Sequence, residues 1–257
     1  MIVDTHAHYD DEAFAKDQSE VLNGLFDKGV ATVVNATASM NGCGRTMEMI
    51  EKYPFVYGMQ GVHPDDVGEL TEADMDIIYH NAQHDKIVAI GEIGLDYHWD
   101  IADHDTQKKW FVRQMEVARE LKMPICVHSR DAAADTLSVM KEARASEIGG
   151  VIHCYSYSAE MAKEFLNMGF YFGIGGVATF KNGRKCKETI DVVPLECIVL
   201  ETDAPYLAPE PFRGKRNDSS LIAYVAEEIA KIKGVSAEEV IRQTAENAHR
   251  VYPKLSL

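Results

Sequence analysis

The sequence predicts one (β/α)8 barrel, and three observations favour this fold class. The chain has 257 residues, close to the ~250 that are typical of such barrels. Short apolar runs alternate with longer amphipathic stretches from one end of the chain to the other, and eight of these runs are candidate strands. Eight β-α units in about 250 residues favour a closed parallel barrel over an open sheet. A doubly wound sheet is the structural alternative, but neither GxGxxG nor a phosphate loop is present.

The expected strands are rich in Val and Ile and mostly lack polar alternation, as is typical of strands buried on both faces. They span residues 2–5, 31–35, 56–62, 87–93, 124–128, 150–153, 170–174 and 197–201. The helices expected between and after them span 17–28, 43–52, 72–83, 106–122, 132–145, 159–168, 185–190, 218–233 and 236–252.

Helix boundaries carry local signals. Thr71 and Ser236 are expected N-caps, each with an acid three residues later. Gly29, Gly169 and Gly234 follow apparent helix ends, where a left-handed backbone is favoured. No linker or low-complexity segment divides the chain, so residues 1–257 are expected to form one barrel domain.

Composition excludes some classes of protein. The net charge is −15, from 26 Lys and Arg against 41 Asp and Glu, which argues against sequence-independent coating of nucleic acid. It does not exclude an enzyme that handles phosphates through bound cations, because a metal pair adds about +4 locally. No apolar run is long enough for a membrane span and no secretion signal is apparent. Five cysteines without a CxxC pair indicate free thiols and a cytoplasmic protein.

Metal-binding residue types follow the expected strands. Strand ends carry His6, His8, His63, Glu92, His128, His153 and Asp203, and barrel enzymes keep their active sites at this carboxyl end. Each residue alone has an ordinary structural explanation as a hydrogen-bonded histidine, a buried acid or a cap. Their conjunction predicts a metal site, since the other histidines fall outside the strands: His80, His84, His98, His104 and His249.

The first strand supplies a pair of candidate ligands. His6 and His8 have i, i+2 spacing and point to the same side of an extended chain. Asp4, two residues earlier, either orients the site from behind or caps the strand. Asp10 and Asp11 are expected to be ordinary loop acids.

Four histidines and two carboxylates suit two divalent ions. One ion takes His6, His8, Glu92 and Asp203, and the other takes Glu92, His128 and His153. Glu92 then bridges the ions, which can activate a water and clamp both reacting oxygens of a phosphoryl displacement. The mixed nitrogen and oxygen ligands do not choose between Mg²⁺, Mn²⁺ and Zn²⁺.

Nine segments together resemble the TatD family of metal-dependent deoxyribonucleases. They run from residue 4 to residue 252 and cover essentially the whole chain: "DTHAH", "GVHPDD", "GEIGLDYH", "PICVHSRDA", "VIHCYSYS", "GIGGVATFKN", "LETDAPYLAP", "RGKRN" and "TAENAHRVY". The resemblance implies a barrel that hydrolyses phosphodiester bonds of DNA with divalent metals. It also implies that His63 contacts the scissile phosphate or its water. The ligands it implies are His6, His8, Glu92, His128, His153 and Asp203. Two departures concern the substrate: Tyr157 replaces a glycine, and Asp218 and Ser219 follow "RGKRN" where relatives often continue Glu-Pro, which predicts a less rigid loop.

The resulting hypothesis is hydrolysis of short or single-stranded DNA ends, with no membrane and no obligatory protein partner. An activated water attacks phosphorus, Asp203 accepts its proton and His63 or His128 steadies a phosphate oxygen. The expected phosphate-binding residues are Arg130, Arg213, Lys215 and Arg216. The residues expected to stack on unpaired bases are Tyr155, Tyr157 and Phe180.

Two other function classes remain open from the residues. A binuclear amidohydrolase or lactonase would act on C–N or C–O bonds, and many such enzymes bridge their metals with a carboxylated lysine. Here strand four presents Glu92, and Lys86 lies at the opposite end of that strand. A metal-storing or phosphate-binding scaffold would enclose its ions without an open water position.

Overall fold

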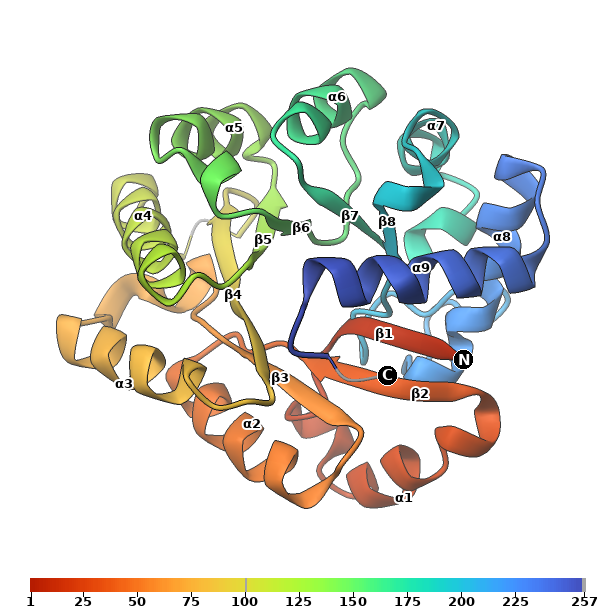
Figure 1. Ribbon diagram of the computed structural model, residues 1–257, viewed down its shortest axis with the longest axis horizontal. Coiled ribbons are helices and arrows are strands. Elements are labelled where there is room, and N and C mark those ends of the chain that lie inside the picture. Colours follow the sequence, from red (N-terminus) through yellow and green to blue (C-terminus); the bar gives the residue numbers. More distant parts are fainter. Residues whose placement is uncertain (100, 256–257) are drawn as a thin grey trace.

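A barrel of eight parallel strands forms the centre of the computed structural model, which describes residues 1–99 and 101–255 (Figure 1). The strands follow one another in chain order around the barrel, and the (β/α)8 fold class is confirmed. Their bounds are β1 Ile2–Ala7, β2 Val30–Asn35, β3 Val56–Gln60, β4 Ile87–Asp96, β5 Ile125–Arg130, β6 Gly150–Ile152, β7 Tyr171–Ile174 and β8 Ile198–Leu200.

The barrel is closed where its first and last strands meet. Ala7 forms a parallel bridge with Ala204, and the Asp203 amide donates to the His6 carbonyl at 2.9 Å. This closure brings the end of β1 beside the segment that follows β8.

Strands β4 and β5 extend beyond their predicted ends. Their pairing continues through Gly94 with His128 and Asp96 with Arg130. Glu92 and His128 therefore lie inside their strands rather than at the last residue, because the ladder between these neighbours does not stop there. Gly94 has a φ of 150°, and a Cβ at this position would collide with the carbonyl oxygen of His128.

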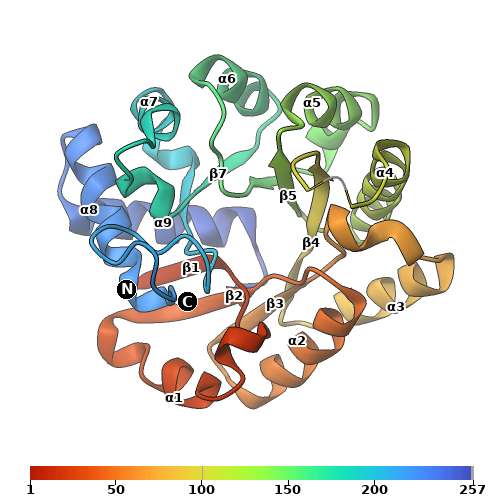
Figure 2. The ribbon, with the colours of Figure 1, turned by 180° about the vertical axis from the view of Figure 1, so that it is seen from behind.

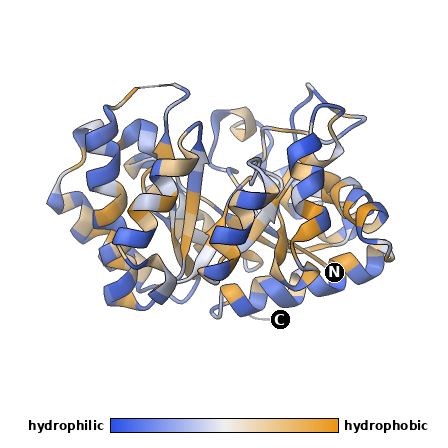
Figure 3. Cartoon of the chain, turned by 90° about the horizontal axis from the view of Figure 1, so that it is seen from above, coloured by the Kyte–Doolittle hydropathy of each residue, from blue (hydrophilic) through white to orange (hydrophobic). Residues whose placement is uncertain are grey.

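Helices alternate with the strands and surround them. Their bounds are α1 Gln18–Asn23, α2 Met40–Lys52, α3 Glu72–Ala82, α4 His104–Leu121, α5 Ala133–Glu142, α6 Ala159–Asn167, α7 Arg184–Val192, α8 Ile222–Lys233 and α9 Ala237–Val251. The helix expected over 17–28 is shorter: Gly24 ends α1, and a separate 3-10 turn covers Phe26–Lys28. The helix expected from 218 begins with a 3-10 turn at Ser219–Leu221. In Figure 3, apolar residues gather in the strands and on the inner sides of the helices.

The predicted caps have the expected chemistry. The Ser236 hydroxyl accepts from the Glu239 amide at 3.1 Å, and the Thr71 amide donates to the Asp74 carboxylate at 2.8 Å. Gly29, Gly169 and Gly234 have φ values of 85°, 82° and 69°, which confirms their left-handed conformation after helix ends.

Helix α9 covers the amino-terminal end of the barrel (Figure 1). Ala248, Val251 and Tyr252 pack with residues from the starts of the strands, such as Val3 and Val199, in one buried cluster. The opposite end, seen in Figure 2, carries the loops that follow the strands. With one end closed by α9, this loop-bearing end is left for a functional site.

Two further predictions concerned free cysteine thiols and the lack of a membrane span. All five cysteines are free, and Cys43, Cys126 and Cys186 are buried. Within the described residues, the helices include none with the length and apolar character of a membrane span.

Removing the buried ring of Phe172 should destabilise the barrel. Phe172 lies in β7, is fully buried and packs edge-to-face against Tyr155 with ring centroids 5.0 Å apart. We expect Phe172→Ala to lower the free energy of unfolding by about 3–5 kcal/mol, through the lost transfer energy and the cavity that remains. Calorimetric Tm values measure the change. The matched control is Phe26→Ala, because Phe26 is 68% exposed; equal Tm values for the two variants would contradict the prediction.

Candidate metal centre

Six candidate ligands converge at the carboxyl end of the barrel. His6, Glu92 and His128 come from β1, β4 and β5, and His153 follows β6 directly. His8 and Asp203 lie in the segments after β1 and β8, which the closure of the barrel holds together. Asp203 has a φ of 58°, an uncommon conformation for a residue other than glycine and one that clusters at functional sites.

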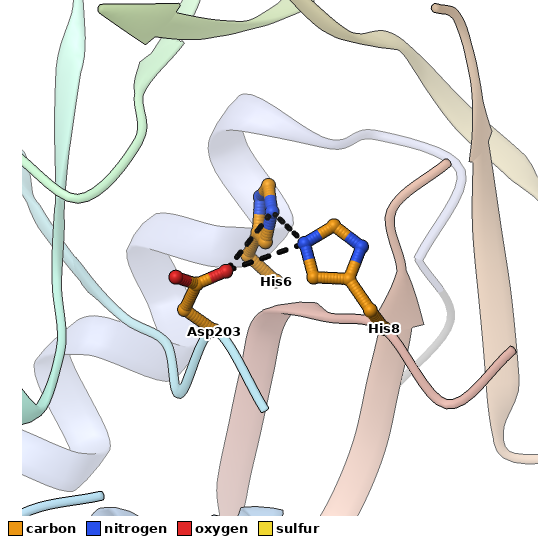
Figure 4. A group of neighbouring side chains, drawn as sticks. All are labelled: His6, His8 and Asp203. Atoms are coloured by element: carbon orange, nitrogen blue, oxygen red, sulfur yellow. Dashed lines mark hydrogen bonds and ion pairs between the residues drawn. The ribbon is translucent and has the colours of Figure 1, made fainter. Parts of the chain in front are cut away.

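Four of the side chains form a compact set of donor atoms. His6 Nε2 lies 3.2 Å from His8 Nε2 and 3.3 Å from Glu92 Oε2. Asp203 Oδ1 lies 3.2 Å from His8 Nε2 and 3.9 Å from His6 Nε2 (Figure 4). Ligands about 2.0–2.2 Å from a tetrahedral ion are separated from one another by about 3.3–3.6 Å. The three shortest separations lie close to this range, and His6, His8 and Asp203 together could hold a metal ion.

The second oxygen of Glu92 faces a different pair of imidazoles. Glu92 Oε1 lies 2.7 Å from His128 Nδ1 and 3.7 Å from His153 Nε2. His153 Nε2 also lies 3.7 Å from Asp203 Oδ1. The two carboxylate oxygens of Glu92 thus belong to two adjoining groups of metal-binding atoms, an arrangement that a bridging ligand requires.

Charges within the site are strongly coupled. Burial alone would lower the pKa of the histidines, but facing carboxylates raise the pKa of His8 and His128 to about 9 and that of His153 to about 10. Burial would raise the pKa of Glu92, but the surrounding imidazoles hold it well below its usual range. The site favours positive charge between its carboxylates, which is the condition for binding a cation.

His63 has a different electrostatic character. Burial and the neighbouring His128 lower the pKa of His63 to about 3, so its ring is neutral. Its Nδ1 accepts from the Asp65 amide at 3.2 Å, which leaves the proton on Nε2. His63 lines the same cavity as His128 and offers a hydrogen-bond donor there.

Two buried acids support the histidines, and the sequence analysis missed both. Asp96 Oδ2 lies 3.0 Å from His128 Nε2. Glu201 Oε1 lies 3.1 Å from His153 Nδ1 and accepts from the Cys154 amide at 2.7 Å. Glu201 ends a predicted strand, so the rule that found Glu92 and Asp203 could have found it. Asp96 could not be found in this way, because β4 runs to Asp96 and beyond its predicted end.

Asp4 holds the end of β1 against the segment after β8. It is fully buried, and it accepts from the Thr202 hydroxyl at 2.7 Å and from the Ser219 hydroxyl at 2.6 Å. Asp4 was expected either to orient the site from behind or to cap the strand. These contacts fit the orienting role, because they position the Thr202–Asp203 segment beside His6. Ser219, in the loop expected to be less rigid, is itself buried and hydrogen-bonded to Asp4.

The site opens into a cavity of about 810 Å³. Asp10 and Asp11, expected to be ordinary loop acids, lie in the loop after β1 and line this cavity. Arg45 and Arg130 bring positive charge to the lining, and Trp99 and Tyr206 bring exposed aromatic rings. Of these four, sequence reasoning found only Arg130.

The tyrosines predicted to stack on bases are occupied elsewhere. Tyr155 is 2% exposed, and its hydroxyl donates to the Ser158 carbonyl at 2.7 Å. The Tyr157 hydroxyl is bonded to the Ser129 hydroxyl at 3.0 Å, and its ring packs on the core. Neither ring lines the cavity formed by the described residues. Burial of Tyr155 speaks against its stacking on a base, and stacking on Tyr157 stays a prediction.

The basic residues of the "RGKRN" segment also lie outside the cavity. Arg216 pairs with Asp17 at 2.6 Å, and the Arg213 guanidinium covers the Phe180 ring at 4.2 Å. Lys215 is exposed. Arg213, Lys215, Arg216 and Phe180 are absent from the described residues that line the cavity. Their contacts with the flanking parts of a substrate stay predictions.

Fold and site together define a (β/α)8 barrel with a candidate metal centre at its carboxyl end. Residues 3–253 match the family model described as TatD related DNase, and the chain belongs to this family. It is 44% identical over 252 residues to the uncharacterised metal-dependent hydrolase YabD of Bacillus subtilis, with 98% of this chain and 99% of that one covered. The chain is a metal-dependent hydrolase.

Other relatives extend the comparison. The 3'-5' ssDNA/RNA exonuclease TatD of Salmonella typhimurium is 30% identical over 244 residues, which cover 93% of this chain and 94% of that protein. The crystal structure of the TatD homologue YJJV of Escherichia coli superposes with a TM-score of 0.92 at 26% identity, and 98% of each chain is covered.

Metal affinity should rise with pH. At neutral pH the imidazoles of His8, His128 and His153 are protonated in the metal-free protein, because their pKa values are about 9, 9 and 10. Metal binding must displace these protons. We expect Mn²⁺ to bind about tenfold more tightly per pH unit for each displaced proton until the pH reaches these pKa values. Calorimetric titration in buffers of different ionisation enthalpy counts the protons, and equal affinity at acidic and neutral pH would contradict the prediction.

Glu201→Gln should weaken metal binding without unfolding the protein. The change keeps the acceptor for the Cys154 amide but removes the negative charge beside His153 Nδ1. Loss of such a supporting partner costs about 10–100-fold in metal affinity. Mn²⁺ titration measures the effect, with Glu227→Gln on the exposed face of α8 as the matched control. Wild-type affinity in Glu201→Gln would show that Glu201 does not support the site.

Proposed function

We propose that this protein hydrolyses phosphodiester bonds of DNA at single-stranded ends, with two divalent metal ions. One observation carries the proposal: the two oxygens of the buried Glu92 carboxylate face separate groups of imidazoles, 3.3 Å from His6 and 2.7 Å from His128. Such a paired site suits the displacement of one phosphate oxygen by another. The relative named as a 3'-5' ssDNA/RNA exonuclease supports nucleic acid as the substrate class.

The residues divide into two ligand groups. His6, His8, Glu92 and Asp203 would hold one ion, and Glu92, His128 and His153 would hold the other. Ions at these positions would polarise the phosphoryl oxygens and lower the pKa of a water. The donor set does not distinguish Mg²⁺, Mn²⁺ and Zn²⁺.

Other groups of the chain handle the substrate and its protons. Neutral His63 would donate from Nε2 to a non-bridging phosphate oxygen. Asp203 is ionised, because His8 and His153 outweigh the effect of burial and lower its pKa. Its carboxylate would accept the proton of the water whose oxygen bonds to phosphorus, while the phosphorus–oxygen bond to the leaving sugar breaks.

The charge of the protein favours a short substrate footprint. A net charge of −15 opposes binding along a long duplex, whereas Arg45 and Arg130 at the cavity offer local positive charge to a strand end.

The free cysteines are consistent with action in a reducing compartment, and we propose that the protein acts in the cytoplasm.

Amide or lactone hydrolysis is the rival activity. Lys86 immediately precedes β4 and donates a hydrogen bond to the Tyr53 carbonyl at 2.7 Å. It is absent from the described residues that line the cavity. Glu92 thus stands where a bridging carboxylate is needed. A panel of lactones, cyclic amides and phosphodiesters discriminates the two activities, and we expect efficient turnover of the phosphodiesters alone.

Glu92→Gln should abolish most of the nuclease activity. The amide cannot serve both ligand groups as a charged bridge, so we expect the metal-dependent rate on a labelled single-stranded oligonucleotide to fall about 100-fold or more. Gel analysis of the cleavage products measures the rate, and Glu227→Gln is the control. Full activity in Glu92→Gln, or faster turnover of a lactone than of DNA by the wild type, would refute the proposed function.

A further inference from the structure

We propose that Trp99 is a stacking platform for an unpaired nucleobase and gives this protein a preference for single strands. The inference rests on the proposed function, because it names the part of the substrate that the rim of the same cavity binds. Neither the Trp99 ring nor the loop that carries it belongs to the candidate metal centre.

Trp99 is unusually placed for a tryptophan. It lies in the loop after β4, lines the cavity and is 60% exposed. The other tryptophan of the chain, Trp110, is packed in α4 and only 4% exposed. A large ring exposed at a cavity that also contains His128 and Asp203 has apolar surface to offer a ligand.

Neighbouring residues support the ring. The Arg130 guanidinium lies over it at 5.4 Å from the centroid. The His98 ring meets it edge-to-face at 4.9 Å, and His98 Nδ1 is held by Asp131 at 3.0 Å. These contacts leave much of the indole open while limiting its movement, which lowers the entropy lost when a base stacks.

Asp96 links this platform to the metal centre. Its Oδ1 accepts from the amides of His98 at 2.8 Å and Trp99 at 3.3 Å. Its Oδ2 lies 3.0 Å from His128 Nε2. One buried carboxylate thus fixes both the backbone of Trp99 and a candidate ligand, so a base on the indole is held in register with a phosphate at the centre.

The chemistry of the platform selects single strands. Bases in a duplex are already stacked and paired, whereas a base at an unpaired end presents its face to an aromatic ring. Arg130 beside the ring can contact the adjoining phosphate. Stacking of this kind does not depend on base identity, so it suits an enzyme that degrades strands of any sequence.

Fluorescence tests binding directly. With oligothymidylate carrying phosphorothioate linkages, which resist cleavage, we expect quenching of the exposed Trp99 while the emission of buried Trp110 is unchanged. Trp99→Phe should remove the quenched component. Unquenched wild-type emission at concentrations that saturate cleavage would overturn the stacking site.

Steady-state kinetics test whether the Trp99 ring contributes to substrate binding. Trp99→Ala should raise KM for a single-stranded oligonucleotide about 5- to 150-fold, which corresponds to about 1–3 kcal/mol for one stacked base, with kcat nearly unchanged. Exposed Phe26, just before β2 at the amino-terminal end of the barrel, supplies the matched control Phe26→Ala. A single abasic nucleotide moved along the substrate should raise the wild-type KM at one position, and Trp99→Ala should lose that sensitivity.

The outcomes separate the two proposals. Wild-type KM and wild-type abasic sensitivity in Trp99→Ala would overturn the stacking site and leave the nuclease activity standing. If the phosphorothioate oligonucleotide quenches Trp99 but the wild type does not cleave the unmodified oligonucleotide, the nuclease activity is overturned and the stacking site is supported. Absence of both signals would overturn both.

Discussion

The buried carboxylate of Glu92 is the constraint on which the rest of the site depends. Burying a charge is costly unless it is paired, and Glu92 is 3% exposed. Its compensation comes from imidazoles on β1, β5 and the end of β6, within 2.7–3.7 Å. Only a closed barrel brings these strands, distant in sequence, to one point. The buried charge of Glu92 therefore depends on the barrel fold, because the fold brings the compensating imidazoles to the carboxylate.

A second layer of contacts decides which nitrogen each histidine offers. His8 Nδ1 lies 3.0 Å from the Ala36 carbonyl, and His153 Nδ1 lies 3.1 Å from Glu201. A partner on one ring nitrogen fixes the tautomer and orients the other nitrogen. In both histidines the remaining Nε2 faces Asp203 or Glu92. The orientation of these two histidines thus depends on the Ala36 carbonyl and on Glu201, which lie behind the facing carboxylates of Glu92 and Asp203.

The sequence was informative where the backbone determines position and poor where side chains choose partners. His6 and Glu92 could be found because parallel strands end on one face. The pairing of Arg216 could not be predicted, since its partner Asp17 is 199 residues away and becomes a neighbour only in the fold. Trp99 was missed for a related reason: no periodic pattern distinguishes its exposed ring from the buried ring of Trp110.

The acidic surface explains why short-range contacts matter in this protein. Exposed charges act over roughly 8–10 Å at physiological salt, so a net charge of −15 does not draw a polyanion inward from a distance. An anionic strand bound as proposed would gain its affinity inside the cavity, from the proposed metal ions and from Arg45 and Arg130. The proposed stacking on Trp99 would add a contribution that does not depend on charge, which is most useful to an enzyme as acidic as this one.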